Sequence, residues 1–565
     1  GLTYTYKLRK GAKWYTSDGE EYAEVKAQDF VTGLKHAADG KSEALYLVQN
    51  SIKGLDAYIK GETKDFSTVG VKALDDYTVQ YTLNKPESYW NSKTTSGILF
   101  PINADFLASQ GSGFGSAKPS SILYNGPYIL KSLTAKSSIE YKKNENYWDK
   151  ENVPIEDVKL SYYDGSDQES LVRNFSDGAY TLARVFPNSS NYASVKKKYA
   201  DNITYSQQGG TSFFYVFNVN RQSYNHTSKK DDKQKSDTKA AILNKDFRQA
   251  IGFAFDRKAY AAQTNGEDGA SMVLRNLAVP PTFVQIRDRN FGDVVKEKLA
   301  SYGQEWSDVK LEDAQDGLYN AEKAKTEFAK AKEALQAQGV NFPIHLDLPV
   351  SQSDKAGIQQ ASSFKQSVES ALGKDNVVVD LQQMSEDDFN NTGYFANSAA
   401  QKDYDLSTSG WTPDYQDPST YLDVFDPTNG GLLQAIGIEP GQNQDVVSAL
   451  GLNDYKALND DANKETSDTS VRYEKYANSQ AWLTDSGLTL PSISNGANPL
   501  VQKSVPFTRA YSWIGSKGTA TNYKYMQLQD DVLTSKDYEK AFKTWMKEKE
   551  SSNEKAQKEL EKHVK

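Results

Sequence analysis

The stretch from Asp405 to Leu422, which reads DLSTSGWTPDYQDPSTYL, carries the residues best suited to hold a ligand. Gly410 lets another backbone approach closely, Trp411 offers a large apolar face, and Asp414 offers a charge that only accepts hydrogen bonds. An ammonium group, such as the one at the start of a free peptide, would suit this carboxylate. The mixture of small and polar residues predicts a binding loop rather than a helix or a core strand.

The segments that precede this loop predict units in which a helix is followed closely by a strand. One helix is expected to begin after Asn320, a good N-cap, and to stop at Gly339. The pattern then recurs up to the loop, with a helix over 363–372 and strands over 344–348, 377–381 and 404–407. This repetition indicates an α/β fold, in which ligands bind where loops diverge at the ends of strands.

Three other segments have distinctive patterns. The stretch from Arg221 to Lys239 is polar and rich in lysine, which predicts an exposed and mobile insertion. A helix is expected to begin at Asp246 as its N-cap. The tail from Ser535 to Lys565 predicts a long charged helix that docks through Tyr538, Phe542, Trp545 and Met546.

Composition argues against several functional classes. The net charge of -9, with no concentrated basic run, argues against a nucleic-acid partner. The chain has no cysteine and only four scattered histidines, so no metal pair and no signature of a Ser-His-Asp triad is present. The acidic run at Glu386 is typical of a helix N-terminus, which we prefer to a metal site. No apolar run is long enough to cross a membrane. We therefore expect no cofactor, no metal and no enzymatic activity.

The motif WTPDYQDPSTYL, which begins at Trp411, resembles the W-x-x-D-Y-x-D-P signature of the peptide/nickel class of extracytoplasmic solute-binding proteins that serve ABC importers. Other segments match that family in the same order along most of the chain. They are LTYTYKLRKGAKW at Leu2, VKALDDYTVQYTLNKP at Val71, NGPYIL at Asn125, KNENYWDKENVPIEDV at Lys143, FRQAIGFAFDR at Phe247 and VPP at Val279. The segments KAYAAQTNGEDGAS and WLTDSGLTLP most resemble the streptococcal Ami/Ali-type oligopeptide-binding lipoproteins.

This resemblance implies an α/β, bilobal fold like that of periplasmic binding proteins, the Venus flytrap, with a small extra domain. Residues 1–123 would form the small domain, 124–204 with 490–565 the first lobe, and 205–489 the second lobe with the ligand loop. The family pattern places a signal sequence, a lipid-modified cysteine and the first part of the large domain before Gly1. The implied protein is a monomer that is lipid-anchored at the extracellular face of the cell membrane and delivers oligopeptides to an ABC permease.

The resemblance also implies roles for residues of the motif. Asp414 matches the residue that takes the α-ammonium of the peptide, although from the residues alone it could equally cap its own loop. Backbone groups of Gly410 and Thr412 match positions that bond the ligand main chain as an added β-strand. Trp411 belongs either to the core or to a lid over an early side chain of the peptide, and we favour the lid because Trp411 stands between Gly410 and the polar run. Tyr415 is expected in the same site.

Three further positions complete the expected site. Thr408 stands where relatives that clamp short peptides carry an arginine, which can hold the ligand carboxylate bidentately. We therefore expect longer peptides, or a carboxylate that is paired elsewhere. Tyr89 and Trp90 either face the cleft from the small domain or belong to its core. The pair Asp417-Pro418 is expected to fix the loop rather than to touch ligand.

Two alternative functions remain open from the sequence. The first is a surface peptide sensor or adhesin with this fold, which the sequence does not distinguish from a transport protein. Growth of a deletion strain on peptides as the sole source of amino acids would distinguish them. A secreted hydrolase, which is less favoured because no nucleophile or metal signature is present, would consume its substrate during long incubation.

Overall fold

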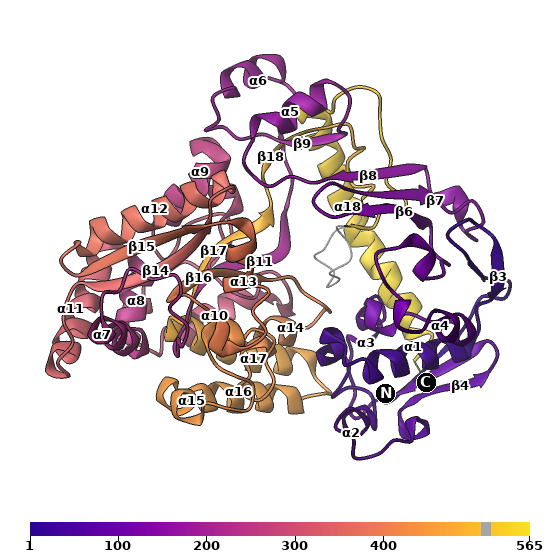
Figure 1. Cartoon of the computed structure of the whole chain (residues 1–565), viewed down its shortest axis with the longest axis horizontal. Helices are drawn as coiled ribbons and strands as arrows, with labels where there is room; N and C mark the ends of the chain where they lie inside the picture. The colour runs from indigo at the N-terminus through magenta and orange to yellow at the C-terminus, as the bar shows by residue number, and fades with distance from the viewer. Residues whose placement is uncertain (510–520, 565) are drawn as a thin grey trace.

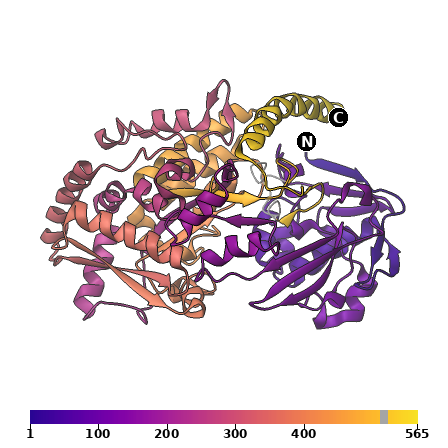
Figure 2. The same ribbon diagram turned by 90° about the horizontal axis from the view of Figure 1, so that it is seen from above.

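The computed structural model describes residues 1–509 and 521–564. Figure 1 shows three groups of elements around a central region: an N-terminal group at the lower right, a small group across the top, and a large group on the left. The view from above in Figure 2 separates the N-terminal elements from the large group in the same way. Among the described residues, no helix is long and apolar enough to span a membrane.

The N-terminal group is built on an antiparallel sheet of order β1-β5-β4 that packs against helix α1. Its core is closed by Leu34, Trp90 and other apolar residues that are nearly inaccessible to solvent. The elements are β1 (Thr3–Lys7), β2 (Lys13–Tyr15), β3 (Glu21–Glu24), α1 (Ala27–Asp39), α2 (Leu55–Ile59), β4 (Val71–Asp75), β5 (Thr78–Thr82), α3 (Trp90–Lys93) and α4 (Ala104–Gln110).

The upper group contains two small antiparallel sheets, of order β6-β7-β8 and β10-β18-β9. The second sheet joins distant parts of the chain, because β18 returns after the whole of the large group to pair with β9 and β10. The elements are β6 (Tyr128–Thr134), β7 (Ser138–Lys143), β8 (Asp157–Ser161), α5 (Glu169–Ser176), β9 (Leu182–Arg184), α6 (Tyr192–Lys198), β10 (Thr204–Tyr205) and β18 (Pro499–Gln502).

The large group holds the largest buried core, which extends over β11, β14, β15 and the helices that cover them. Its sheets are antiparallel β16-β11-β17 and parallel β14-β15. The strands are β11 (Gln208–Phe217), β12 (Gln285–Ile286), β13 (Arg289–Asn290), β14 (Ile344–Ser351), β15 (Val377–Met384), β16 (Leu406–Trp411) and β17 (Thr489–Gly496). The helices are α7 (Asp232–Leu243), α8 (Lys245–Ala254), α9 (Arg257–Gly269), α10 (Phe291–Leu299), α11 (Ala321–Ala337), α12 (Lys355–Leu372), α13 (Glu386–Thr392), α14 (Ser419–Leu422), α15 (Gln444–Leu450), α16 (Leu452–Lys464) and α17 (Thr469–Ser486).

The helix and strand units before the motif form as predicted. Asn320 caps α11, since its side chain accepts a hydrogen bond from the amide of Lys323. The pairs α11-β14 and α12-β15 then place two parallel strands beside each other. Ser385 caps α13, so the acidic run at Glu386 forms the first turn of a helix, as expected.

Two local predictions are wrong. The stretch from Arg221 to Lys239 is no exposed insertion, because Arg221 and Lys229 are buried against the carboxylate of Asp347 in β14 and helix α7 begins within the stretch. The helix predicted from Asp246 is capped by Asn244, whose side chain accepts from the amide of Phe247. Asp246 lies in the first turn, where its charge is also favourable.

The tail forms helix α18 (Ser535–Glu561) as predicted. Its first turns pack on Phe507, whose ring meets those of Tyr538, Phe542 and Trp545 with centroids 5.6, 6.1 and 5.0 Å apart. Met546, also expected at this contact, is 45% exposed. Figures 1 and 2 both show that α18 leads back toward the N-terminal group.

Candidate functional site

Strand β16 carries the first part of the motif, so the structure corrects the prediction of a loop there: the loop begins only at Thr412. Pairing with β11 explains the difference, since it satisfies the backbone groups of a segment whose side chains alone would not predict a strand. Gly410 stands opposite Phe213, and a β-carbon there would lie 2.7 Å from the Phe213 ring. The absence of a side chain at Gly410 thus serves the packing of β11.

The outer edge of β16 faces away from β11. The amide of Asp405, just before the strand, donates to the carbonyl of Asp347 in β14 at 3.1 Å. Over the described residues, no further backbone hydrogen bond joins β14 to β16. The backbone from Thr408 to Gly410, where β16 is no longer buried, therefore offers an edge at which an extended chain can add as a strand.

Tyr46 of the N-terminal group contacts both Trp411 and Asp414. The Tyr46 hydroxyl donates to Oδ2 of Asp414 at 3.0 Å, and its ring meets the Trp411 ring edge-on with centroids 6.0 Å apart. Burial and the neighbouring carboxylate raise the pKa of Tyr46, so the hydroxyl keeps its proton and remains a donor. Asp414 itself is buried, and its amide donates to Oγ1 of Thr420 at 2.9 Å.

The other predicted residues lie in different surroundings. Thr412 shares a hydrogen bond with Thr211 of β11 through their hydroxyls, 2.8 Å apart. Tyr415 is buried and stacks on Tyr89, with centroids 5.0 Å apart and planes inclined by 20°. Trp90 has no exposed surface. Tyr89, Trp90 and Tyr415 therefore belong to the buried core of the N-terminal group.

Asp417 fixes the loop, as predicted. It is fully buried, and its two carboxylate oxygens each accept from Arg472 of α17 at 2.8 Å. Arg472 also donates to the hydroxyl of Tyr89 at 3.4 Å. This bidentate pair ties the loop to α17 and to the N-terminal group, so the position of Asp414 is held from two sides.

Asp423, which follows helix α14, lies among charged groups at the end of this loop. Burial, followed by repulsion from Asp426, raises the pKa of its carboxyl to about 7, although Arg472 acts to lower it. A raised folded-state pKa contributes stability that is complete below the unfolded pKa and is lost as the pH rises through about 7. We expect the contribution of Asp423 to lower the free energy of unfolding by about 1 kcal/mol for each pH unit between pH 5 and 7.

The variant Asp423→Asn tests this expectation, because the amide cannot ionise. Urea unfolding at pH 5, 6 and 7 should show a smaller fall in stability with pH for the variant than for the parent chain. Equal slopes for the two proteins would mean that Asp423 stays ionised throughout this range.

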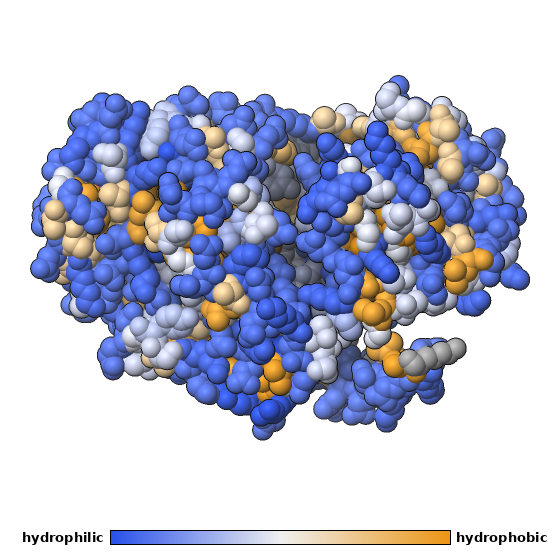
Figure 3. Space-filling model, turned by 90° about the horizontal axis from the view of Figure 1, so that it is seen from below, coloured by the Kyte–Doolittle hydropathy of each residue, from blue (hydrophilic) through white to orange (hydrophobic). Residues whose placement is uncertain are grey.

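A cavity of about 510 Å³ opens beside β16, between the upper and the large groups. Thr408 and Ser409 line it from β16, and Thr408 is exposed there. Its remaining walls come from β9 and the segment after β8 on one side, and from β11, β14, β17, α9, α12 and α13 on the other. Figure 3 shows that the face seen from below is hollowed between the two halves of the molecule.

Two features of the site were not predicted from the sequence. Tyr46 is separated from Asp414 by 368 positions, and no pattern in its own segment marks it as a binding residue. The upper wall of the cavity comes from the segment around Arg184, where a charged residue inside the apolar run LARVF was the available signal. Within the described ranges, no group of three or more histidine, aspartate or glutamate side chains is arranged to hold a metal ion.

Comparison with known proteins supplies the wider context. Residues 1–431 match the model of the bacterial extracellular solute-binding proteins, family 5. The whole chain aligns with the oligopeptide-binding protein AliB of Streptococcus pneumoniae at 62% identity and covers 86% of that protein. It also aligns over its whole length with the oligopeptide-binding protein SarA of Streptococcus gordonii, at 59% identity and again covering 86%. In fold it is similar to the peptide-bound OppA of Listeria monocytogenes (TM-score 0.67, 23% identity, 94% of this chain and 88% of that one). These likenesses confirm the predicted α/β fold with two lobes.

Proposed function

The chain belongs to the bacterial extracellular solute-binding proteins of family 5, and from that premise we propose that it binds extended oligopeptides for uptake by an ABC importer. The names of its relatives support the peptide as ligand, since AliB and SarA are both oligopeptide-binding proteins. The observation that carries the proposal in this chain is the placement of a buried carboxylate, Asp414, directly beyond the edge strand β16.

Asp414 would bind the α-ammonium of the peptide. A buried carboxylate gains most from a partner of opposite charge, and one charge-assisted hydrogen bond contributes about 1.5–3 kcal/mol. The hydroxyl of Tyr46 orients Oδ2, and the pair of Asp417 with Arg472 holds the loop. Trp411, whose ring meets Tyr46, would cover an early side chain of the peptide.

The peptide main chain would add to the edge of β16. Backbone groups of Thr408, Gly410 and Thr412 lie on or next to this edge, and hydrogen bonds to a peptide backbone do not depend on its side chains. The site would thus select for a free N-terminus and an extended conformation, and accept many sequences.

The remaining proposals concern the cycle as a whole. The units 1–123, 124–204 with 490–565, and 205–489 would move about hinges, so that ligand shifts an equilibrium toward a closed form that the permease recognises. The protein would act as a monomer, anchored by lipid at the outer face of the cell membrane, without covalent chemistry.

A native mass spectrum of the purified protein tests the peptide assignment most directly. We expect a spread of additional masses in the peptide range, which disappears on denaturation and can be sequenced. A single mass equal to that of the bare chain, together with no heat of binding for a mixed peptide library, would contradict the proposal.

A further inference from the structure

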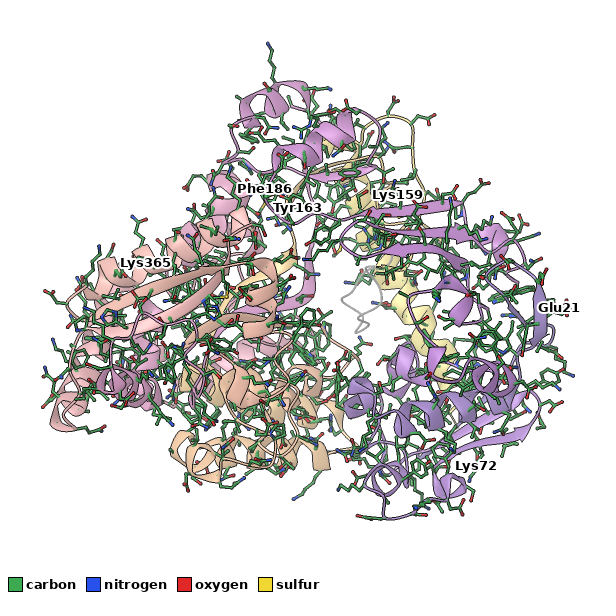
Figure 4. All side chains as sticks on the ribbon, viewed as in Figure 1. Glu21, Lys72, Lys159, Tyr163, Phe186 and Lys365 are labelled. Carbon is green, nitrogen blue, oxygen red and sulfur yellow. The ribbon has the colours of Figure 1, made fainter. Side chains whose placement is uncertain are left out.

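The cavity beside β16 has one positively charged group among its lining residues, Arg184 at the end of β9. The acidic side chain among its lining residues is that of Asp354. That carboxylate caps α12, since its Oδ1 accepts from the amide of Gly357 at 3.0 Å. Figure 4 labels Tyr163 and Phe186, which line the same upper wall where it faces the large group.

Arg184 uses few of its hydrogen-bond donors. A guanidinium has five N–H groups, yet the bond that Arg184 makes to another described residue is one of 3.3 Å, from Nη2 to Oδ1 of Asn265. Its Nε is enclosed without an acceptor, and over the described ranges no carboxylate lies within ion-pair distance. The Phe186 ring lies beneath the guanidinium, with 4.8 Å between Cζ and the ring centroid.

Two fully buried arginines of this chain find their partners within the protein. Arg248 donates to the carbonyls of Ser486 and Ile242, at 2.9 and 2.8 Å. Arg275 forms an ion pair with Asp313 at 3.0 Å. Arg184 differs in that it is only half-buried, lines a cavity and has no such partner among the described residues within hydrogen-bond or ion-pair distance; burial lowers its pKa to about 10, although Tyr163 and Asp354 act to raise it. Its charge is therefore placed where an anion from outside the chain would compensate it.

The position of Arg184 fits the direction in which a peptide would lie. A peptide that begins at Asp414 and follows β16 backward reaches Thr408 and Ser409, which line the cavity. Thr408, unlike an arginine, cannot pair with a carboxylate there. We infer that Arg184 binds a carboxylate of the bound peptide from the opposite wall, an inference that rests on the proposed function. This carboxylate belongs either to the C-terminus or to an acidic side chain far from the N-terminus.

Calorimetry with four matched peptides distinguishes the two sources. All four have a free N-terminus and are built from alanine and serine. The first pair differs in a C-terminal acid or amide; the second pair, both amides, differs in glutamate or glutamine at a late position. The parent chain should prefer the charged member of at least one pair by about tenfold or more. In Arg184→Gln this preference should fall below about threefold, with the affinity for the neutral member nearly unchanged.

Two further variants keep the test decisive. Arg184→Lys preserves the charge but not the planar fork, and should keep part of the preference, so it replaces Arg184→Gln if that protein does not fold. The matched control Arg173→Gln alters an exposed arginine of α5, which pairs with Asp167, and should keep the full preference.

The results separate this inference from the function on which it rests. A preference that Arg184→Gln abolishes in the acid and amide pair identifies the C-terminus, and one abolished in the glutamate pair identifies a side chain. Preferences that survive in Arg184→Gln, or a parent chain that prefers neither charged member, would overturn the role of Arg184 while peptide binding stands. Failure of the parent chain to bind any of the four peptides would overturn the proposed function itself.

Discussion

The variant Asp414→Asn is expected to bind peptides with a free N-terminus about 30-fold more weakly than the parent chain, or worse. Loss of one partner from a buried, hydrogen-bonded charge pair costs about 2–5 kcal/mol, and each 1.4 kcal/mol is a factor of ten. The amide keeps the size of the side chain and can still accept from Tyr46, so the loop should retain its shape. Titration calorimetry with one peptide in free and N-acetylated form measures the effect.

The acetylated peptide decides between the two roles that Asp414 can have. If Asp414 binds the α-ammonium, the parent chain strongly prefers the free form, and the variant loses that preference. If Asp414 only supports its own loop, as an acceptor for Tyr46, the variant keeps the same ratio of affinities for the free and the acetylated form as the parent chain. Tyr46→Phe serves as a matched control, since it removes a donor to the same carboxylate and should have the smaller effect.

Features that depend on neighbouring residues were predictable from the sequence. The helix capped by Asn320 and the strands β14 and β15 follow from periodicity and end signals that lie within each segment. The role of Asp417 in its own loop was also predictable, because an Asp-Pro pair in a polar stretch is typical of a turn. Its partner Arg472 lies 55 positions later and carries no such signal.

Features that depend on distant partners were not predictable. β16 is a strand because β11, almost 200 positions earlier in the chain, pairs with it, and the polar residues of β16 concealed this. Tyr46 reaches Asp414 because the N-terminal group lies against the motif, a property of the assembled fold. Tyr89 and Trp90 are aromatic residues of the kind found in binding sites, but they pack in the core together with residues of β4 and β5.

The burial of the segment after Arg221 also depends on distant partners, in this case on carboxylates. A lysine-rich stretch is usually solvated, because burying an unpaired ammonium is costly. Here three carboxylates (Asp347, Asp403 and Asp405) meet it inside the protein, with Arg221 Nη1 at 2.6 Å from Asp347 and Nη2 at 3.0 Å from Asp403. These acids lie more than 100 positions away in β14 and before β16, so the composition of the segment alone indicates the wrong environment.

Lys229→Met is therefore expected to destabilise the large group by about 3–5 kcal/mol, which is typical when one partner of a buried ion pair is removed. Lys229 has no exposed side-chain surface; its Nζ lies 2.9 Å from Asp347 and pairs also with Asp405. Burial acts to raise the pKa of Asp347, but Lys229 and the hydrogen bonds around it outweigh this and hold the pKa at about 2. Asp347 thus remains charged at neutral pH, and without Lys229 the cation left within ion-pair distance of Asp347 and Asp405, among the described residues, is Arg221.

The neighbouring lysine provides the control for this prediction, because Lys230 is exposed while Lys229 is enclosed. Lys230→Met changes the net charge and composition of the segment by the same amount, yet should alter stability by less than about 0.5 kcal/mol. Urea unfolding at neutral pH, followed by tryptophan fluorescence, should show a lower midpoint for Lys229→Met and an unchanged one for Lys230→Met. Equal midpoints would mean that the segment is solvated, as its composition alone predicts, and that the buried ion cluster contributes no net stability to the fold.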